Sequence, residues 1–402
     1  MAHDKENAGP EDQAPAAAFR HRFVPGPLLP MARAVRRFQA RGPRLSTYAP
    51  ISTLEQVSHA PSRACVPAID FHTHLGRWLS DTGEWMQDDV GRVVDLMDSA
   101  NVVALVNLDG RWGRELEENL DRYDRAHPGR FFTFCHLDWR ALGEPDGPDR
   151  LVHSLRRSVA AGARGLKVWK DLGTKVEVRG RRILSDDPML DAVWEEAGAL
   201  GIPVLVHVVD PLAFFQPVDR HNERLEELLL HPKDSRQQGG VTEFHRLIDS
   251  FEHLVASHPG TLFVGAHGLY AENLGRVSEM FDRYRNLFVD VAWVALQLGR
   301  QPRAARALLM KHPDRVLFGT DVFPLRAGIF HVNFRLFETA DEAFSYTDDP
   351  VPGSGRWPIY GLDLPHTVLE QIYRNNACRL LGLPSSGAEE RAEPVGTAQF
   401  QN

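Results

Sequence analysis

At 402 residues the chain is long enough for one large domain or two ordinary ones. Hydrophobic residues make up 43% and charged residues 25%, a composition typical of a globular protein. The 46 basic and 54 acidic residues give a formal charge of −8, which does not indicate nucleic acid or an anionic membrane as a partner. We expect a small-molecule substrate, with a homo-oligomer compatible with the composition.

The sequence of the first segment does not predict that it belongs to a hydrophobic core. Residues 1–45 are rich in Ala, Pro, Gly and charge, and we predict a flexible leader, with one short basic helix at 31–44 as the alternative. This segment lacks the apolar stretch of a signal peptide. No apolar run approaches the roughly 20 residues of a membrane span. The three cysteines, Cys65, Cys135 and Cys378, form no CxxC pair, so we expect a reducing cytoplasm.

Short apolar runs then alternate with helical patterns. Three of the intervening stretches, at 187–200, 244–255 and 274–284, repeat apolar residues at helical spacing. The strand candidates are short and mainly apolar, as expected for parallel strands covered on their outer face. These eight candidates are residues 66–71, 102–107, 131–135, 165–168, 204–206, 262–266, 287–291 and 315–318.

Eight strands alternating with helices predict a (β/α)8 TIM barrel. No GxGxxG motif follows the first strand, which disfavours a dinucleotide-binding fold. We assign residues 46–385 to the barrel domain and residues 386–402 to a disordered tail. The barrel has a long insertion after its fifth strand, because 60 positions (267 minus 207) separate His207 from His267.

Histidines and one aspartate occur at the ends of four predicted strands. His72 and His74 end the first strand, and residues two apart in an extended segment point the same way. With 18 histidines in the chain, such a pair alone is expected by chance. His207, His267 and Asp321 end the fifth, sixth and eighth strands, and a barrel gathers these ends at one mouth. The set suits Zn²⁺ or a similar divalent cation, such as Mn²⁺.

These motifs resemble those of the amidohydrolase superfamily, in particular its amidohydrolase-related branch of metal-dependent hydrolases and non-oxidative decarboxylases. The resemblance covers residues 66–383 and rests on DFHTH (70–74), VLVHV (204–208), FVGAHG (263–268), FGTD (318–321) and the terminal helix at 375–383. It implies that His72, His74 and His207 bind the metal. It also implies that Asp321 binds the ion or its water and accepts a proton, and that His267 acts as the general acid/base.

Other polar residues near the predicted mouth have alternative roles. Lys167 ends the fourth strand, where some superfamily members carry a carboxylated lysine that bridges two metals; a substrate-facing cation is the alternative. The segment 210–224 follows His207 and is either a lid over the substrate or a surface insertion. The remaining candidates for substrate or supporting contacts are Arg77, Arg111, His136, Asp138 and Arg300.

Three functions fit this set. The first, which we predict over the other two, is hydrolysis of an amide, lactone or ester by metal-activated water. The second is non-oxidative decarboxylation of an aromatic or enoic acid, a lyase reaction that the resemblance also implies. The third is a catalytically silent metal-binding scaffold, which the complete set from His72 to Asp321 disfavours. An arginine beside the metal would favour a carboxylate substrate and hence decarboxylation.

Overall fold

The computed structural model describes residues 53, 55–321, 325, 328–347, 349 and 352–384. The chain divides after Glu55, and the barrel belongs to the second unit, Gln56–Asn402. The predicted leader, with its alternative helix, and the predicted tail lie outside the described residues. Among the helices of the described part, none is long and apolar enough to cross a membrane.

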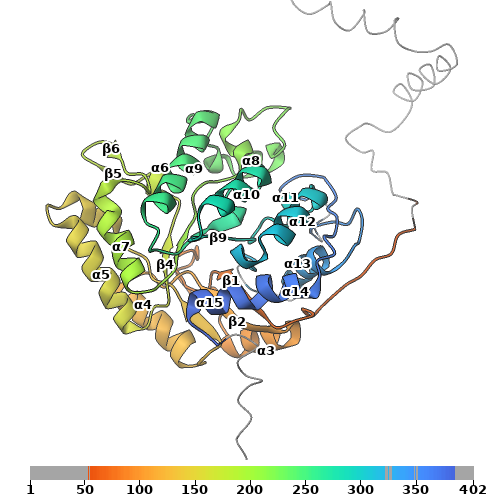
Figure 1. The fold of residues 1–402 in the computed structure, drawn as a ribbon, viewed down its shortest axis with the longest axis horizontal. Coiled ribbons are helices and arrows are strands. Elements are labelled where there is room, and N and C mark those ends of the chain that lie inside the picture. The colour runs from red at the N-terminus through yellow and green to blue at the C-terminus, as the bar shows by residue number, and fades with distance from the viewer. Residues whose placement is uncertain are drawn as a thin grey trace, which may run out of the picture. The chain divides into compact units, whose positions relative to one another are not determined.

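Eight parallel strands confirm the number and order predicted from the sequence, with small differences at their ends. Figure 1 shows β1, β4 and β9 near the centre of the domain, with helices around them. They are β1 (Ala68–Thr73), β2 (Val102–Asn107), β3 (Phe131–Thr133), β4 (Leu166–Val168), β7 (Val204–Val206), β8 (Phe263–Gly265), β9 (Leu287–Asp290) and β10 (Val316–Leu317).

Backbone hydrogen bonds join these strands into a closed ring. β1, β2 and β3 form one parallel sheet, and β10, β9, β8, β7 and β4 form a second. At one seam Cys135, just past β3, pairs with Leu166, and the amide of Lys167 donates to the Cys135 carbonyl at 2.8 Å. At the other seam the amide of Phe71 donates to the carbonyl of Phe318, just past β10, at 2.8 Å. The strands follow the ring in chain order, which is the predicted TIM barrel.

Side chains alternate along the strands between the barrel interior and the layer beneath the helices. In β7, Leu205 belongs to the inner core, whereas Val204 and Val206 belong to the outer one. In β4, Leu166 and Val168 belong to the outer core. Because alternate strand residues face opposite sides, the residue between those two, Lys167, takes a position on the inner face.

The helices cover the strands with apolar stripes. In α9 (Gly240–Ser257) the buried residues include Phe244, Ile248 and Phe251, which confirms the predicted spacing. The other longer helices are α3 (Val90–Ala100), α4 (Gly113–Leu120), α5 (Gly147–Ala161), α7 (Asp191–Ala199), α10 (Leu274–Arg283), α12 (Pro302–Lys311) and α13 (Ile329–Glu338). Shorter helical segments are α6 (Asp171–Thr174), α8 (Leu225–Leu230), α11 (Ala295–Leu298), α14 (His366–Glu370) and α15 (Asn376–Leu381).

Helix α15 seals one end of the barrel. Its Leu380 and Leu381 are buried in the same inner core as Phe288 of β9. The side-chain amide of Asn376 donates to the carbonyl of Val316 at 2.7 Å. Because Val316 is the first residue of β10, α15 covers the end where the strands begin, away from the carboxyl ends that carry the predicted site.

Two connections differ from the sequence prediction. The predicted helix at 187–200 begins as a 3-10 turn, Pro188–Leu190, in which the Asp187 carboxylate accepts the amide of Met189 at 3.1 Å, and continues as α7. After β4, an antiparallel hairpin of β5 (Glu177–Val178) and β6 (Arg181–Arg182) was not predicted. The long insertion after the fifth barrel strand is present: between β7 and β8 it contains α8 and α9.

Candidate metal centre

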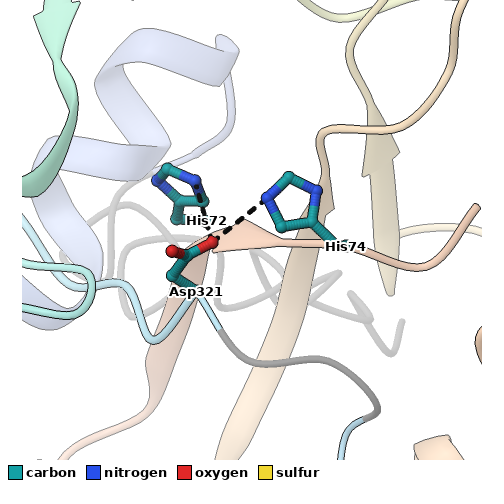
Figure 2. Close-up of side chains that lie close together, drawn as sticks. All are labelled: His72, His74 and Asp321. Carbon is teal, nitrogen blue, oxygen red and sulfur yellow. Dashed lines mark ion pairs between the residues drawn. The ribbon is translucent and has the colours of Figure 1, made fainter. Parts of the chain in front are cut away.

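His72, His74 and Asp321 bring three ligand atoms together at the carboxyl ends of the strands. Oδ1 of Asp321 lies 3.1 Å from Nε2 of His74 and 3.4 Å from Nε2 of His72, and Figure 2 shows both rings turned toward this carboxylate. All three atoms lie within 4.8 Å of one another. The Asp321 amide also donates to the His72 carbonyl at 2.8 Å, which fixes the loop after β10 against β1.

Two buried carboxylates hold the other nitrogens of these rings, and neither was named from the sequence. Nδ1 of His72 lies 2.8 Å from Oδ2 of Asp290, and Nδ1 of His74 lies 2.7 Å from Oδ1 of Asp109. Metal-binding histidines typically have such a partner, which fixes the ring and leaves the far nitrogen for the ion. Asp290 is the last residue of β9 and Asp109 lies two residues past β2, so position at a strand end was the signal that could have found them.

His207 and His267 contact each other beside this group. Nε2 of His267 lies 3.3 Å from Nδ1 of His207, and the ring centroids of His267 and His72 are 4.9 Å apart. Nε2 of His207 lies 3.7 Å from Oδ1 of Asp210. The structure thus brings His72, His74 and Asp321 into one group, and His207 approaches that group through His267.

The Lys167 amine is buried in the same place. Nζ of Lys167 lies 3.3 Å from Nε2 of His72, and the residue is only 1% exposed. Burial lowers the pKa of Lys167 to about 8, although the carboxylates of Asp321 and Asp290 oppose this shift. A lysine in this position can face a substrate as a cation or donor.

Burial and neighbouring charges set the protonation of the histidines. Burial lowers the pKa of His72, and the Lys167 charge adds to the effect. Burial, and then the charge of His267, lower the pKa of His207 to about 3. Burial also opposes the charge on His74, but the carboxylates of Asp109 and Asp321 outweigh it and raise its pKa to about 9. His72 and His207 are therefore neutral at pH 7, which is the form of imidazole that binds metals.

Left-handed backbone conformations gather at this mouth. Arg111, His267, Trp293 and Asp321, which follow four different barrel strands, all have φ of +58°. Such conformations are unfavourable for residues other than glycine and concentrate at functional sites.

The remaining predicted contacts separate into two groups. Arg77 is paired with Glu118, and Arg300 donates to both oxygens of Glu223 at 3.2 and 2.8 Å. Asp138 caps a helical turn by accepting the amide of Arg140. Arg111 and His136, in contrast, line a cavity beside the metal-binding group. The lining residues of this cavity, here called the wide cavity, include Trp78, Arg111, His136, Trp139, Lys167, Trp169, Lys170, Lys175 and Arg236.

The wide cavity has a volume of about 370 Å³ and contains buried polar atoms without partners. Across the described part of the chain, Nε of Arg111, Nδ1 of His136 and Nε1 of Trp169 have no hydrogen-bond partner. The Arg111 guanidinium lies over the ring of Trp78, 4.9 Å from its centroid. His136 is neutral, because burial lowers its pKa to about 3, and its Nε2 lies 2.6 Å from the Leu108 carbonyl. Its Nδ1 is then an acceptor.

A smaller cavity, here called the narrow cavity, has a volume of about 160 Å³. His207, His267 and Asp321 line it, together with Asp210 and Arg224 from the β7–β8 connection. Asp210 forms ion pairs with Lys170 at 2.6 Å and Arg236 at 3.2 Å, and both of these cations line the wide cavity. The two cavities therefore meet at these ion pairs.

A closed (β/α)8 ring with imidazoles and a carboxylate at its mouth defines a TIM-barrel amidohydrolase. The family model for amidohydrolases matches residues 69–383, and the chain belongs to this family. Its members are metal-dependent enzymes, either hydrolases or decarboxylases.

Solved structures share the fold at low sequence identity. The 2,6-dihydroxybenzoate decarboxylase from Rhizobium is 17% identical, with a TM-score of 0.52, over 79% of this chain and 99% of that one. An uncharacterized TIM-barrel protein from Bordetella bronchiseptica is 14% identical, with a TM-score of 0.50, over 78% and 98%. None of the curated proteins matches the sequence.

Proposed function

We propose that His72, His74, His207 and Asp321 hold one divalent ion, Zn²⁺ or Mn²⁺, and that the protein decarboxylates a small aromatic or enoic acid. The donor types fit such an ion, since imidazole and carboxylate are the ligands of a borderline divalent cation. The carboxylates of Asp109 and Asp290 orient the two β1 rings so that both Nε2 atoms face Asp321.

The wide cavity is the observation that favours an acid as substrate. Lys167 and Arg111 provide positive charge, and Trp78 and Trp169, which pack edge to face with ring centroids 4.8 Å apart, provide an apolar surface. A carboxylate on a planar body satisfies both kinds of surface. Nε of Arg111, which has no hydrogen bond although Oε2 of Glu115 lies 3.9 Å away, and Nε1 of Trp169 would hold the acid. Nδ1 of His136 would accept a hydroxyl hydrogen.

The chemistry can then be assigned to residues of this chain. A bound divalent ion would polarise the substrate and lower the pKa of a water ligand from 15.7 to about 7. In decarboxylation the electrons of the breaking carbon–carbon bond stay on the ring or enoic carbon, and carbon dioxide leaves. That carbon takes a proton, and we assign its delivery to His267 or Asp321, which lie beside His72 and His74 at the candidate metal site.

Hydrolysis of an amide, lactone or ester is the second candidate. The narrow cavity favours it, because His267 and Asp321 both line a small space where water can meet a base and an acid. Asp321 would take the proton from water, and His267 would protonate or stabilise the leaving group.

The fate of oxygen and carbon distinguishes the two reactions. The purified, metal-loaded protein would be offered aromatic acids, enoic acids, lactones, esters and amides in ¹⁸O-labelled water and, separately, in deuterium oxide. We expect release of carbon dioxide from an acid, with solvent deuterium on the product carbon and no ¹⁸O in the product. Incorporation of ¹⁸O into a product carboxylate would establish hydrolysis instead. Turnover of none of these compounds would favour the silent scaffold.

A further inference from the structure

Arg224 is a buried arginine with one free edge. Its side chain is 1% exposed, and it immediately precedes α8 in the β7–β8 connection. Nη1 donates to Oε2 of Glu227 at 2.8 Å. Nε and Nη2 are also buried, yet within the described residues neither has a hydrogen-bond partner.

These two atoms make one recognition surface. The N–H bonds of Nε and Nη2 point in parallel from the same side of the guanidinium plane and match the two oxygens of a carboxylate. Buried donors without partners are unfavourable, so such an edge is rarely left unused in a folded protein. Arg300, a candidate contact named from the sequence, differs because it donates hydrogen bonds to both carboxylate oxygens of Glu223.

The position of Arg224 connects it to the candidate metal centre. Arg224 lines the narrow cavity together with His207, His267 and Asp321. Among the acids that line this cavity, Asp210 is paired with Lys170 and Arg236, and Glu227 binds only Nη1 of Arg224. The protein itself therefore leaves the Nε and Nη2 donors of Arg224 without an acceptor.

We propose that Arg224 binds a second carboxylate of the substrate, and that the substrate is accordingly a small dicarboxylate. The inference rests on the proposed function, in which the reacting carboxylate lies near Lys167 and Arg111 in the wide cavity. Arg224 lines the other cavity, beyond the ion pairs of Asp210. Because one carboxylate cannot occupy both cavities, the free edge of Arg224 selects for a second acidic group.

Binding of simple aromatic acids to the full-length, metal-loaded protein tests this selection. Benzoate, isophthalate and terephthalate share one ring and differ in the number and separation of their carboxylates. By titration calorimetry we expect at least one dicarboxylate to bind about 10- to 100-fold more tightly than benzoate, the range for charged hydrogen bonds. Arg224→Lys keeps the charge but loses the two-point edge, so it should bring the dicarboxylate close to benzoate while benzoate binding stays unchanged.

A matched control and a second variant complete the design. Arg356→Gln removes an arginine that is 63% exposed and pairs with Glu226 of α8, and it should keep the preference. Glu227→Gln removes the carboxylate that pairs with Arg224 and should raise the affinity for the dicarboxylate several-fold. This variant tests the role of Arg224 if Arg224→Lys does not fold. Equal binding of all three acids by the wild type, or a preference that survives Arg224→Lys, would overturn the proposal. Because the experiment measures ratios of binding affinities, its outcome does not depend on whether the protein releases carbon dioxide from an acid.

Discussion

At the scale of single residues, His267 differs from the other imidazoles in what its ring contacts. Its Nδ1 lies 3.0 Å from the carbonyl of Ala292, whereas the rings of His72 and His74 are each held by a buried carboxylate. The Ala292 carbonyl is neutral, and the carboxylate oxygen Oδ2 of Asp321 lies farther from Nδ1, at 4.0 Å. This difference suits a residue that handles a proton and is not a ligand.

We therefore predict opposite results for two substitutions. His74→Ala should lose the metal, because it removes one of the ligands that Asp321 and His72 need to complete the site. His267→Asn should keep about one equivalent of metal per chain and lose turnover by roughly 10²- to 10⁴-fold, the usual contribution of general acid/base catalysis. Elemental analysis and steady-state rates measure the two effects. Metal loss in His267→Asn equal to that in His74→Ala would make His267 a ligand.

The residues of the site were predictable to different degrees. His72, His74, His207, His267 and Asp321 were found because each lies at a strand end, a position that the chain order alone defines. Asp109 and Asp290 occupy equivalent positions and could have been found by the same rule. The unsatisfied donors of Arg224 could not be predicted, because tertiary packing decides which of its nitrogens other side chains satisfy.

At the scale of elements, Gly110 lies at a close approach between the connection after β2 and the chain that follows β3. A Cβ on Gly110 would lie 2.3 Å from the carbonyl oxygen of Phe134, and backbone cannot move aside as a flexible side chain does. Gly110→Ala should lower the free energy of unfolding by about 1–3 kcal/mol, as overpacking does. Urea unfolding measures this loss.

The control for this prediction is another glycine. A Cβ on Gly260 would meet no atom within 4 Å, so Gly260→Ala should change stability by less than about 0.5 kcal/mol. Equal stability of the two variants would mean that the connection after β2 shifts readily. Because Asp109 precedes Gly110 and holds His74, such a shift would also reach the metal centre.

The sequence predicted the eight barrel strands because each is a short apolar run, buried on both faces, that leaves a clear pattern. It did not predict the β5–β6 hairpin, whose strands are two residues long and partly exposed. The turn between them has positive φ at both Arg179 and Gly180, as a two-residue hairpin turn requires. Short exposed pairs carry no hydrophobic period, so only their turn residues indicate them.

At the scale of the whole molecule, the candidate metal centre links the first strand of the barrel to the loop after the last strand. His72 and Asp321 are 249 positions apart (321 minus 72), and one ion would bind both. An ion present at a thousand times its dissociation constant stabilises the folded state by about 4 kcal/mol. Removing it by chelation should lower the Tm by about 5 °C for a domain of this size.

Scanning calorimetry with and without chelator measures this shift, with elemental analysis to verify that the metal is gone. His74→Ala provides the control, because its Tm should not respond to chelator. An unchanged Tm after complete metal loss would contradict a metal site that links the first strand to the loop after the last strand.

The seam between β1 and β10 also has a consequence for synthesis on the ribosome. The first strand leaves the ribosome with one edge unpaired, and its partner at this seam, the chain around Phe318, is made almost 250 residues later. At about 5–20 residues per second, that edge stays open for roughly 12–50 seconds. During this interval the strand Ala68–Thr73, which is fully buried in the folded protein, lacks its neighbour on one edge. Such an unpaired edge can aggregate, so we expect chaperones to bind this segment of the nascent chain.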